Sequence, residues 1–262
     1  MADVLAVLKP HWEQRPETAG RLRGRIERVL NAAKAQGYRT GENPAAWRGH
    51  LENLLPPRQK LGRGHHEALP WSQVPEFMGA LRQREGVAAL AVEFAILTAA
   101  RSGEVRGAAW DEFDVAAKLW TVPPERMKAG REHRVPLTAR AVEIIETVSK
   151  LPNDAYVFPG MKSGAPLSDM SLSAVLRRMT VAATVHGFRS SFKDWASEAT
   201  SYPNELSEAA LAHITGDKVE RAYRRGDALE RRRELMEAWA QYCEPSPAGN
   251  VVAMRKPAHS AG

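Results

Sequence analysis

The stretch LWTVPPERMKAGREHRVPL, residues 119–137, decides the fold class because it interrupts a chain whose other patterns are helical. Residues 119–122 and 133–137 are typical of two short strands, and the turn formers Pro123, Pro124 and Gly130 lie between them. Strands joined over so short a distance pair antiparallel. We therefore predict a β-hairpin with Lys128 in its turn.

Helices are predicted on both sides of this hairpin. The first covers about residues 17–36 and ends at Gly37, and its apolar stripe consists of Leu22, Ile26, Val29, Leu30 and Ala33. The apolar run 87–100, interrupted by Glu93, predicts a core helix. Further helices are expected near residues 138–149, 169–179, 188–199, 204–212, 217–225 and 228–242, with Thr138 and Asp227 as N-caps of two of them. The expected fold class is mainly α with a small antiparallel β-sheet, an α+β arrangement.

The segment from Pro56 to Glu67 is the best linker candidate, because it combines Pro, Gly and charged residues. Before it, GENPAAWRGH (residues 41–50) predicts a turn followed by a short helix. We therefore expect a helical domain over residues 1–62, a second domain over 63–244, and a flexible tail over 245–262, where Pro, Ser, Gly and Ala dominate.

Positive charge is concentrated in the first quarter of the chain. The formal net charge is +6, and residues 1–63 hold twelve Lys or Arg against six Asp or Glu, so the remainder sums to zero. Arg21, Arg25 and Arg28 fall mostly off the apolar stripe of the first helix, facing water or phosphate. This distribution favours a DNA-gripping segment, and the alternative is a solvated basic helix without a partner.

The sequence also argues against several classes of protein. Its single cysteine, Cys243, excludes an internal disulfide and a cysteine-based metal cluster. The chain begins without the charged start and apolar run of a signal peptide, and no stretch approaches the roughly 20 apolar residues that span a bilayer. We therefore expect a cytoplasmic protein without membrane contact.

Four short segments carry residue types that are suited to binding phosphate. They are LTAARSGEVRG around Arg101, RMKAGREHRVPL around Lys128, HGFR from His186 to Arg189, and LAHITGDKVERAYRR, which holds His213 and Tyr223. Each segment alone is typical of ordinary surface or packing residues. Together they supply two guanidiniums, a lysine, two imidazoles and a phenol, and guanidiniums clamp phosphate oxygens in a bidentate manner.

Nearly the whole chain, from Asp3 to about Glu244, resembles the tyrosine recombinases, specifically the satellite-phage type of integrase that often inserts elements at tRNA genes. The resemblance is closest in RMKAGREHRVPL, HGFRSSFKDWASE, LSEAALAH and AYRRGDALERRRELMEAWAQYC. The stretches PETAGRLRGRIERVL and GENPAAWRGHL resemble the core-binding domain of that group. The resemblance implies a partial helical core-binding domain followed by a tyrosine-recombinase catalytic domain.

Roles for individual residues follow from this resemblance. Arg101 and Arg189 match the two arginines that bind the non-bridging oxygens of the scissile phosphate, and Tyr223 matches the nucleophile. Lys128 matches the hairpin lysine that protonates the leaving 5′-oxygen. The remaining matches are His186, which assists proton transfer, His213, which hydrogen-bonds the phosphate, and Glu104, which orients the active-site arginine.

The same resemblance implies a site-specific recombinase that integrates or excises a mobile element. Its partners would be double-stranded DNA attachment sites and three further copies of the chain, as a homo-tetramer on DNA that can be a monomer without it. No metal and no other cofactor are expected. The arm-binding domain of full-length integrases is expected to be absent, and the core-binding domain to begin late. The alternatives are a catalytically silent remnant that only binds DNA, and a type IB topoisomerase, which LSEAALAH and RRRELMEAWAQY do not match.

Overall fold

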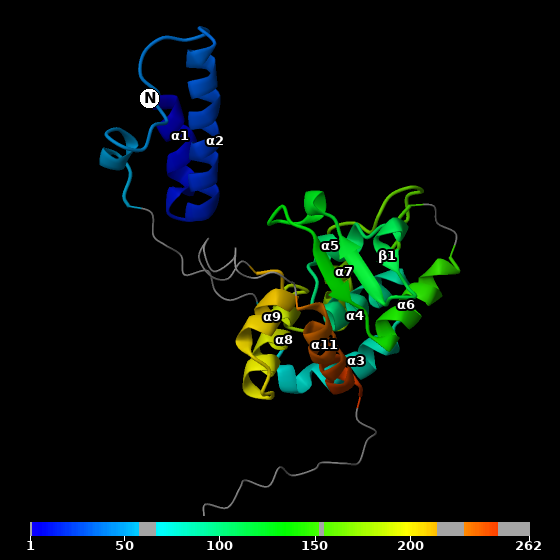
Figure 1. Ribbon diagram of the computed structural model, residues 1–262. Helices are drawn as coiled ribbons and strands as arrows, with labels where there is room; N and C mark the ends of the chain where they lie inside the picture. Colours follow the sequence, from blue (N-terminus) through cyan, green and yellow to red (C-terminus); the bar gives the residue numbers. More distant parts are fainter. Residues whose placement is uncertain (1, 58–66, 152–154, 214–227, 246–262) are drawn as a thin grey trace, which may run out of the picture. The chain divides into compact units, whose positions relative to one another are not determined.

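The computed structural model describes residues 2–57, 67–151, 155–213 and 228–245. The chain separates into two compact units, residues 1–64 and residues 65–262 (Figure 1). The expected helix at 217–225, most of the expected linker and nearly all of the expected tail lie outside the described residues.

The N-terminal unit is built on two packed helices, α1 (Ala2–Trp12) and α2 (Pro16–Ala35), followed by a single 3-10 turn, η1 (Leu51–Asn53). Its small core is closed by Trp12, whose ring stacks on Trp47 at 5.5 Å between centroids. The indole N–H of Trp12 also donates to the Pro56 carbonyl at 2.9 Å. The core consists of Val4, Leu8, Trp12, Ala19, Ala45, Leu51 and Leu55.

Three local expectations need correction in this unit. The helix α1 was not predicted, because its apolar positions form a useful face only when α2 covers them. Val29 is 67% exposed and lies outside the apolar stripe, whereas Leu22, Ile26 and Leu30 pack against the core. The expected short helix at residues 41–50 is replaced by turns that lead into η1.

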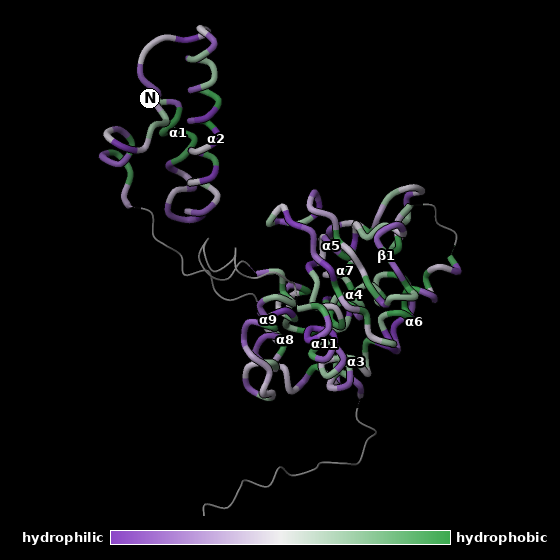
Figure 2. Tube along the Cα trace, viewed as in Figure 1, coloured by the Kyte–Doolittle hydropathy of each residue, from purple (hydrophilic) through white to green (hydrophobic). Residues whose placement is uncertain are grey.

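The second unit surrounds a buried helix, α4 (Val87–Thr98), with helices and one small sheet. Every residue from 91 to 100 is buried, and Figure 2 shows this hydrophobic helix in the interior of the unit. The surrounding helices are α3 (Val74–Arg82), α5 (Ser102–Arg106), α6 (Ala139–Ser149), α7 (Ser171–Arg178), α8 (Gly187–Glu198), α9 (Asn204–Ala210) and α11 (Leu229–Cys243). The short 3-10 turns are η2 (Trp71–Gln73), η3 (Trp110–Glu112) and η4 (Pro124–Arg126).

The sheet of the described residues is antiparallel, with strands in the order β1 (Phe113–Asp114), β2 (Leu119–Val122) and β3 (His133–Pro136). Trp120 pairs with Val135 on one side and with Phe113 on the other. The predicted hairpin is therefore confirmed, with β3 ending one residue earlier than expected. The strand β1 was missed, because two residues leave no alternation to detect. The expected fold class, mainly α with a small antiparallel sheet, is confirmed.

Of the two predicted N-caps, the structure confirms one. The hydroxyl of Thr138 accepts a hydrogen bond from the Ala141 N–H at 3.4 Å, which confirms this predicted N-cap of α6. At the start of α11 the N-cap position belongs to Ala228 instead, with φ of 51°. The predicted cap, Asp227, lies outside the described residues.

Charged and aromatic contacts join the two ends of this unit. Glu93, 2% exposed within α4, accepts from Arg82 at 2.7 Å and from Arg140 at 2.8 Å, so its buried charge is paired.

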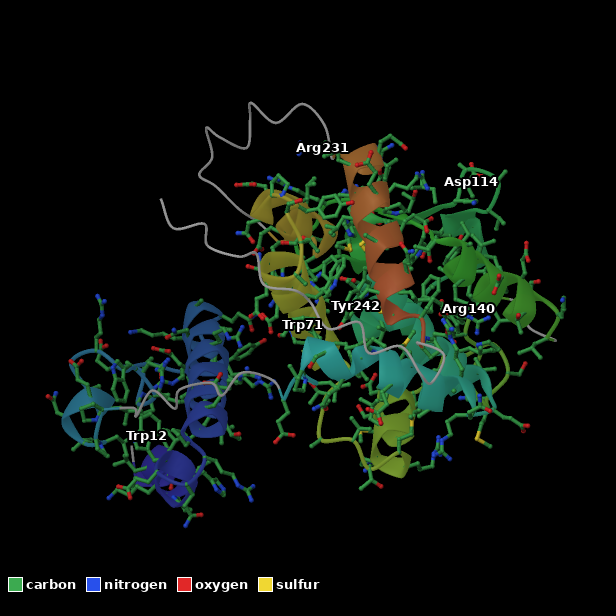
Figure 3. The ribbon with its side chains drawn as sticks, turned by 90° about the horizontal axis from the view of Figure 1, so that it is seen from below. Trp12, Trp71, Asp114, Arg140, Arg231 and Tyr242 are labelled. Carbon is green, nitrogen blue, oxygen red and sulfur yellow. The ribbon has the colours of Figure 1, made fainter. Side chains whose placement is uncertain are left out.

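Trp71 and Tyr242 lie together in Figure 3, with ring centroids 5.7 Å apart. The Trp71 indole N–H donates to Glu198 at 2.9 Å, so the segment that enters the unit is held by both α8 and α11.

None of the described helices is both long enough and apolar enough to cross a membrane.

Candidate active site

Arg101 lies at the start of α5, immediately after the buried helix α4 ends. Its backbone is extended, with φ of −76° and ψ of 146°, and its N–H donates to the Glu104 carboxylate at 2.9 Å. The Nη1 of Arg101 donates to the other oxygen of the same carboxylate at 2.7 Å. Because Glu104 is only 5% exposed, it holds the Arg101 guanidinium in one direction.

Arg189 lies in the first turn of α8 and is 5% exposed. Its Nη1 donates to the carbonyl of Ala99, and its Nη2 donates to the carbonyl of Leu211 at 2.6 Å. Among the described residues, its buried Nε has no hydrogen-bond partner. Burial, together with the charge of Arg101, lowers the pKa of Arg189 to about 10, so the guanidinium is still a cation at neutral pH.

His213 follows α9 and contacts Arg189 directly. The His213 Nε2 lies 3.3 Å from the Nη2 of Arg189, and its Nδ1 lies 2.6 Å from the Glu208 carboxylate. Sequence reasoning missed Glu208, although it stands five residues before the histidine in the quoted segment LSEAALAH. His213 lies beyond the end of α9, and its backbone N–H donates to the Glu208 carbonyl at 3.0 Å, so the turn that ends the helix brings the two side chains together. The nearness of the two residues in the sequence was the available signal.

The structure brings the predicted residues together to different degrees. The contacts above form two pairs, Arg101 with Glu104 and Arg189 with His213. The pairs are neighbours, because Arg189 donates to the carbonyl of Ala99, two residues before Arg101, and the charges of Arg101 and Glu104 act on the Arg189 pKa. His186 is the N-cap of α8, exposed, and its carbonyl accepts from the Arg189 N–H at 3.1 Å. Lys128 lies in the hairpin turn, as predicted, and is exposed. Within the described ranges, no side-chain hydrogen bond or ion pair joins Lys128 to either pair.

Steric contact explains why the HGFR segment has a glycine at position 187. A Cβ on Gly187 would collide with the backbone of Glu67 and Ala68, and the Glu67 carbonyl accepts from Thr184 N–H at 2.9 Å. The chain entering this unit therefore passes directly over the start of α8. Only glycine allows this close approach beside His186 and Arg189.

His133, at the start of β3, is a second residue that sequence reasoning missed. Its Nε2 lies 3.2 Å from the carbonyl of Ala210, at the end of α9. Burial, followed by the charge of Arg232, lowers the pKa of His133 to about 4, so the imidazole is neutral at physiological pH. Arg232 of α11 is 1% exposed and donates to the carbonyl of Arg134 at 2.6 Å. These contacts hold the hairpin against α9 and α11. The only sequence signal for this role of His133 was its presence in the segment RMKAGREHRVPL.

The other predicted residues belong to the N-terminal unit or lie beyond the described part. Arg21, Arg25 and Arg28 are exposed on α2 of the N-terminal unit, and Arg21 is paired with Glu17 at 3.0 Å. Tyr223, the expected nucleophile, lies outside the described residues. The described ranges contain no group of three or more His, Cys, Asp or Glu side chains that could hold a metal ion.

The pattern of the Phage integrase family matches residues 67–229, and that of the Phage integrase central domain matches residues 1–50. Because the first match covers more than half of the chain, the chain belongs to the phage integrase family, the tyrosine recombinases.

Individual relatives agree with this membership. Prophage integrase IntZ of Escherichia coli K12 is 33% identical over 95% of this chain, and the integrase of Enterobacteria phage P4 is 29% identical over 87%. The chain spans only 61% and 55% of the length of these two relatives. The fold is similar to that of a lambda integrase (75–356) dimer bound to a COC' core site, with a TM-score of 0.58, 18% identity, and coverage of 83% of this chain and 81% of that one. These similarities favour an integrase over the type IB topoisomerase alternative.

Proposed function

We propose that this chain is a site-specific DNA recombinase that cleaves and rejoins DNA strands through a 3′-phosphotyrosine intermediate at Tyr223. The observation that carries the proposal is the proximity of two pairs, Arg101 held by Glu104 and the buried Arg189 in contact with His213, with the charge of Arg101 acting on the pKa of Arg189. Two fixed guanidiniums and an adjacent imidazole suit the binding of one phosphate. This cleavage and rejoining would integrate or excise a mobile element.

The chemistry explains why these side chains suit the reaction. Attack on a phosphodiester builds negative charge on a five-coordinate phosphorus, and donors already in place stabilise that state more than the ground state. In the proposed site Arg101 and Arg189 bind the non-bridging oxygens, and His213 adds a further hydrogen bond. His186 assists proton transfer, and Lys128 protonates the leaving 5′-oxygen. The covalent phosphotyrosine preserves the energy of the broken bond, so rejoining needs no ATP.

The two units take separate roles in this proposal. Residues 1–62 act as a core-binding domain, residues 63–244 as the catalytic domain, and residues 245–262 as a tail. Lambda integrase has been solved as a tetramer on a Holliday junction. We propose the same arrangement for this chain on double-stranded attachment sites, in the cytoplasm, with a monomer in the absence of DNA.

The first experiment is covalent trapping on DNA. Incubation of the full chain with a nicked suicide duplex that carries its site should yield a protein–DNA adduct that resists boiling in detergent. The adduct should form equally in the presence of EDTA, because the arginines and His213 supply the charge stabilisation that a metal would provide. DNA binding without any adduct on the authentic site would favour the silent-remnant alternative. An adduct that EDTA abolishes would contradict the metal-free mechanism.

A second prediction concerns the N-terminal unit, whose exposed Arg21, Arg25 and Arg28 are proposed to contact DNA phosphates. Affinity should fall as salt rises, with a log–log slope of about −0.9 for each phosphate contact. Arg25→Ala should therefore reduce the slope by about 0.9 in salt titrations of full-length protein. Arg84→Ala, an exposed arginine of the second unit, is the charge-matched control that should leave the slope unchanged. Equal slopes for Arg25→Ala and wild type would count against an electrostatic grip by α2.

A further inference from the structure

A chain of polar contacts runs from Lys193 of α8 to the proposed phosphate site. Lys193 of α8 contacts the carboxylate of Glu208 on α9, and the other oxygen of that carboxylate lies 2.6 Å from Nδ1 of His213. The His213 Nε2 then meets Arg189 at 3.3 Å. The helices α8 and α9 lie side by side in Figure 1, so two helices hold the whole series.

The charge of Glu208 determines what it can accept. Burial by itself would raise the pKa of Glu208, but hydrogen bonds from Lys193 and His213 outweigh it, so the net pKa lies below the ordinary value. Glu208 is therefore a carboxylate at neutral pH and only accepts hydrogen bonds. The proton shared with His213 must consequently sit on Nδ1 of the imidazole.

The Nε2 side of the His213 imidazole leads to the same tautomer. The guanidinium of Arg189 only donates hydrogen bonds, so the His213 Nε2 that faces it accepts. Two neighbours on opposite sides of the imidazole thus select one tautomer, with hydrogen on Nδ1 and a lone pair on Nε2.

We propose that Glu208 is a positioning residue that fixes both the orientation and the tautomer of His213, and that Lys193 holds the Glu208 carboxylate. This inference rests on the proposed recombinase function. A ring held in this way donates to a phosphate oxygen only after Nε2 takes up a proton from solvent. The imidazolium then keeps its Nδ1–H bond to Glu208, as a carboxylate does for the histidine of a hydrolase triad.

Lys193 has a defined part in this arrangement. Its ammonium also contacts the amide oxygen of Asn204, and it lies 3.3 Å from the Ser207 hydroxyl. These contacts place a positive charge against the carboxylate on the side away from His213. The phosphate site therefore stays cationic even though a carboxylate supports it.

The test measures single-turnover formation of the covalent adduct on a suicide duplex with the full chain. Glu208→Ala should slow adduct formation by about 10- to 100-fold, the usual cost of losing a partner that orients a functional histidine. DNA affinity and the unfolding midpoint should stay near wild type. Glu205→Gln is the matched control, since it removes an exposed carboxylate from the same helix and should leave the rate unchanged.

A double variant separates positioning from a merely structural role. If Glu208 acts through His213, then Glu208→Ala combined with His213→Ala should be as slow as His213→Ala alone. Fully additive losses would overturn the proposal, because Glu208 would then act independently of the histidine.

Nitrogen-15 NMR of histidine-labelled full-length protein keeps the inference independent of activity. The His213 signals, identified through His213→Ala, should report the Nδ1–H tautomer in wild type and a mixture in Glu208→Ala. An Nε2–H tautomer in wild type would overturn the proposal. If wild type forms no adduct, the recombinase proposal fails, and the tautomer still decides whether Glu208 positions His213.

Discussion

Tyr223→Phe is expected to abolish the covalent adduct, a loss of at least about 10⁴-fold, as for removal of a catalytic nucleophile. The substitution removes the phenolic oxygen that attacks phosphorus and keeps the aromatic ring for packing. A phenol has an ordinary pKa of about 10, so it attacks only as its proton leaves. The measurement is denaturing electrophoresis of the suicide-duplex reaction, with DNA affinity followed in parallel.

The control for this variant is Tyr202→Phe, which removes a phenolic oxygen from the same unit. Tyr202 is half-buried beside α9, and its backbone N–H contacts Thr200. Because this tyrosine matches no catalytic position, its variant should form the adduct at the wild-type rate. An adduct that survives Tyr223→Phe would show that the nucleophile is a different residue.

Arg189→Lys should give the second largest effect, a loss of about 10²- to 10³-fold in adduct formation, comparable with removing one fixed donor from an oxyanion site. The guanidinium reaches the carbonyls of Ala99 and Leu211 at once and still presents its edge to His213. An ammonium has no planar fork, so it cannot make these contacts and clamp a phosphate as well. Single-turnover rates at saturating protein would measure the loss directly.

Arg189 is buried, so the variant needs a control for folding. Arg106→Lys is matched, because Arg106 also donates to a backbone carbonyl, that of Leu167 at 2.9 Å, and is largely buried. Arg106→Lys should slow adduct formation by less than about 2-fold. It should shift the unfolding midpoint by about as much as Arg189→Lys does, because both substitutions shorten a buried donor. A wild-type rate in Arg189→Lys would remove this residue from the phosphate clamp.

Local patterns in the sequence determined the main features of the fold. The hairpin around Lys128 could be predicted because its strands are separated by turn formers, and the helix α4 because its apolar run is long. Thr138 could be predicted as a cap because its hydroxyl satisfies a nearby N–H. Each of these features depends on residues a few positions apart, so the sequence contains its cause.

The sequence also predicted which residues would belong to the proposed phosphate site. The types, order and resemblance of Arg101, Arg189 and His213 predict them as site residues, and the structure pairs Arg101 with Glu104 and Arg189 with His213. The roles of these residues in the reaction, like those of Lys128, His186 and Tyr223, stay predictions.

Only the tertiary structure decided the environment of these groups. Packing of α8 beside α9 placed Lys193 against the Glu208 carboxylate and Arg189 against His213, and packing against the Glu67 backbone required glycine at position 187. Burial between the hairpin and α9 kept His133 neutral. Hydrogen bonding, desolvation and steric contact depend on distances between segments far apart in the chain, and the folded packing of helices and sheet sets those distances.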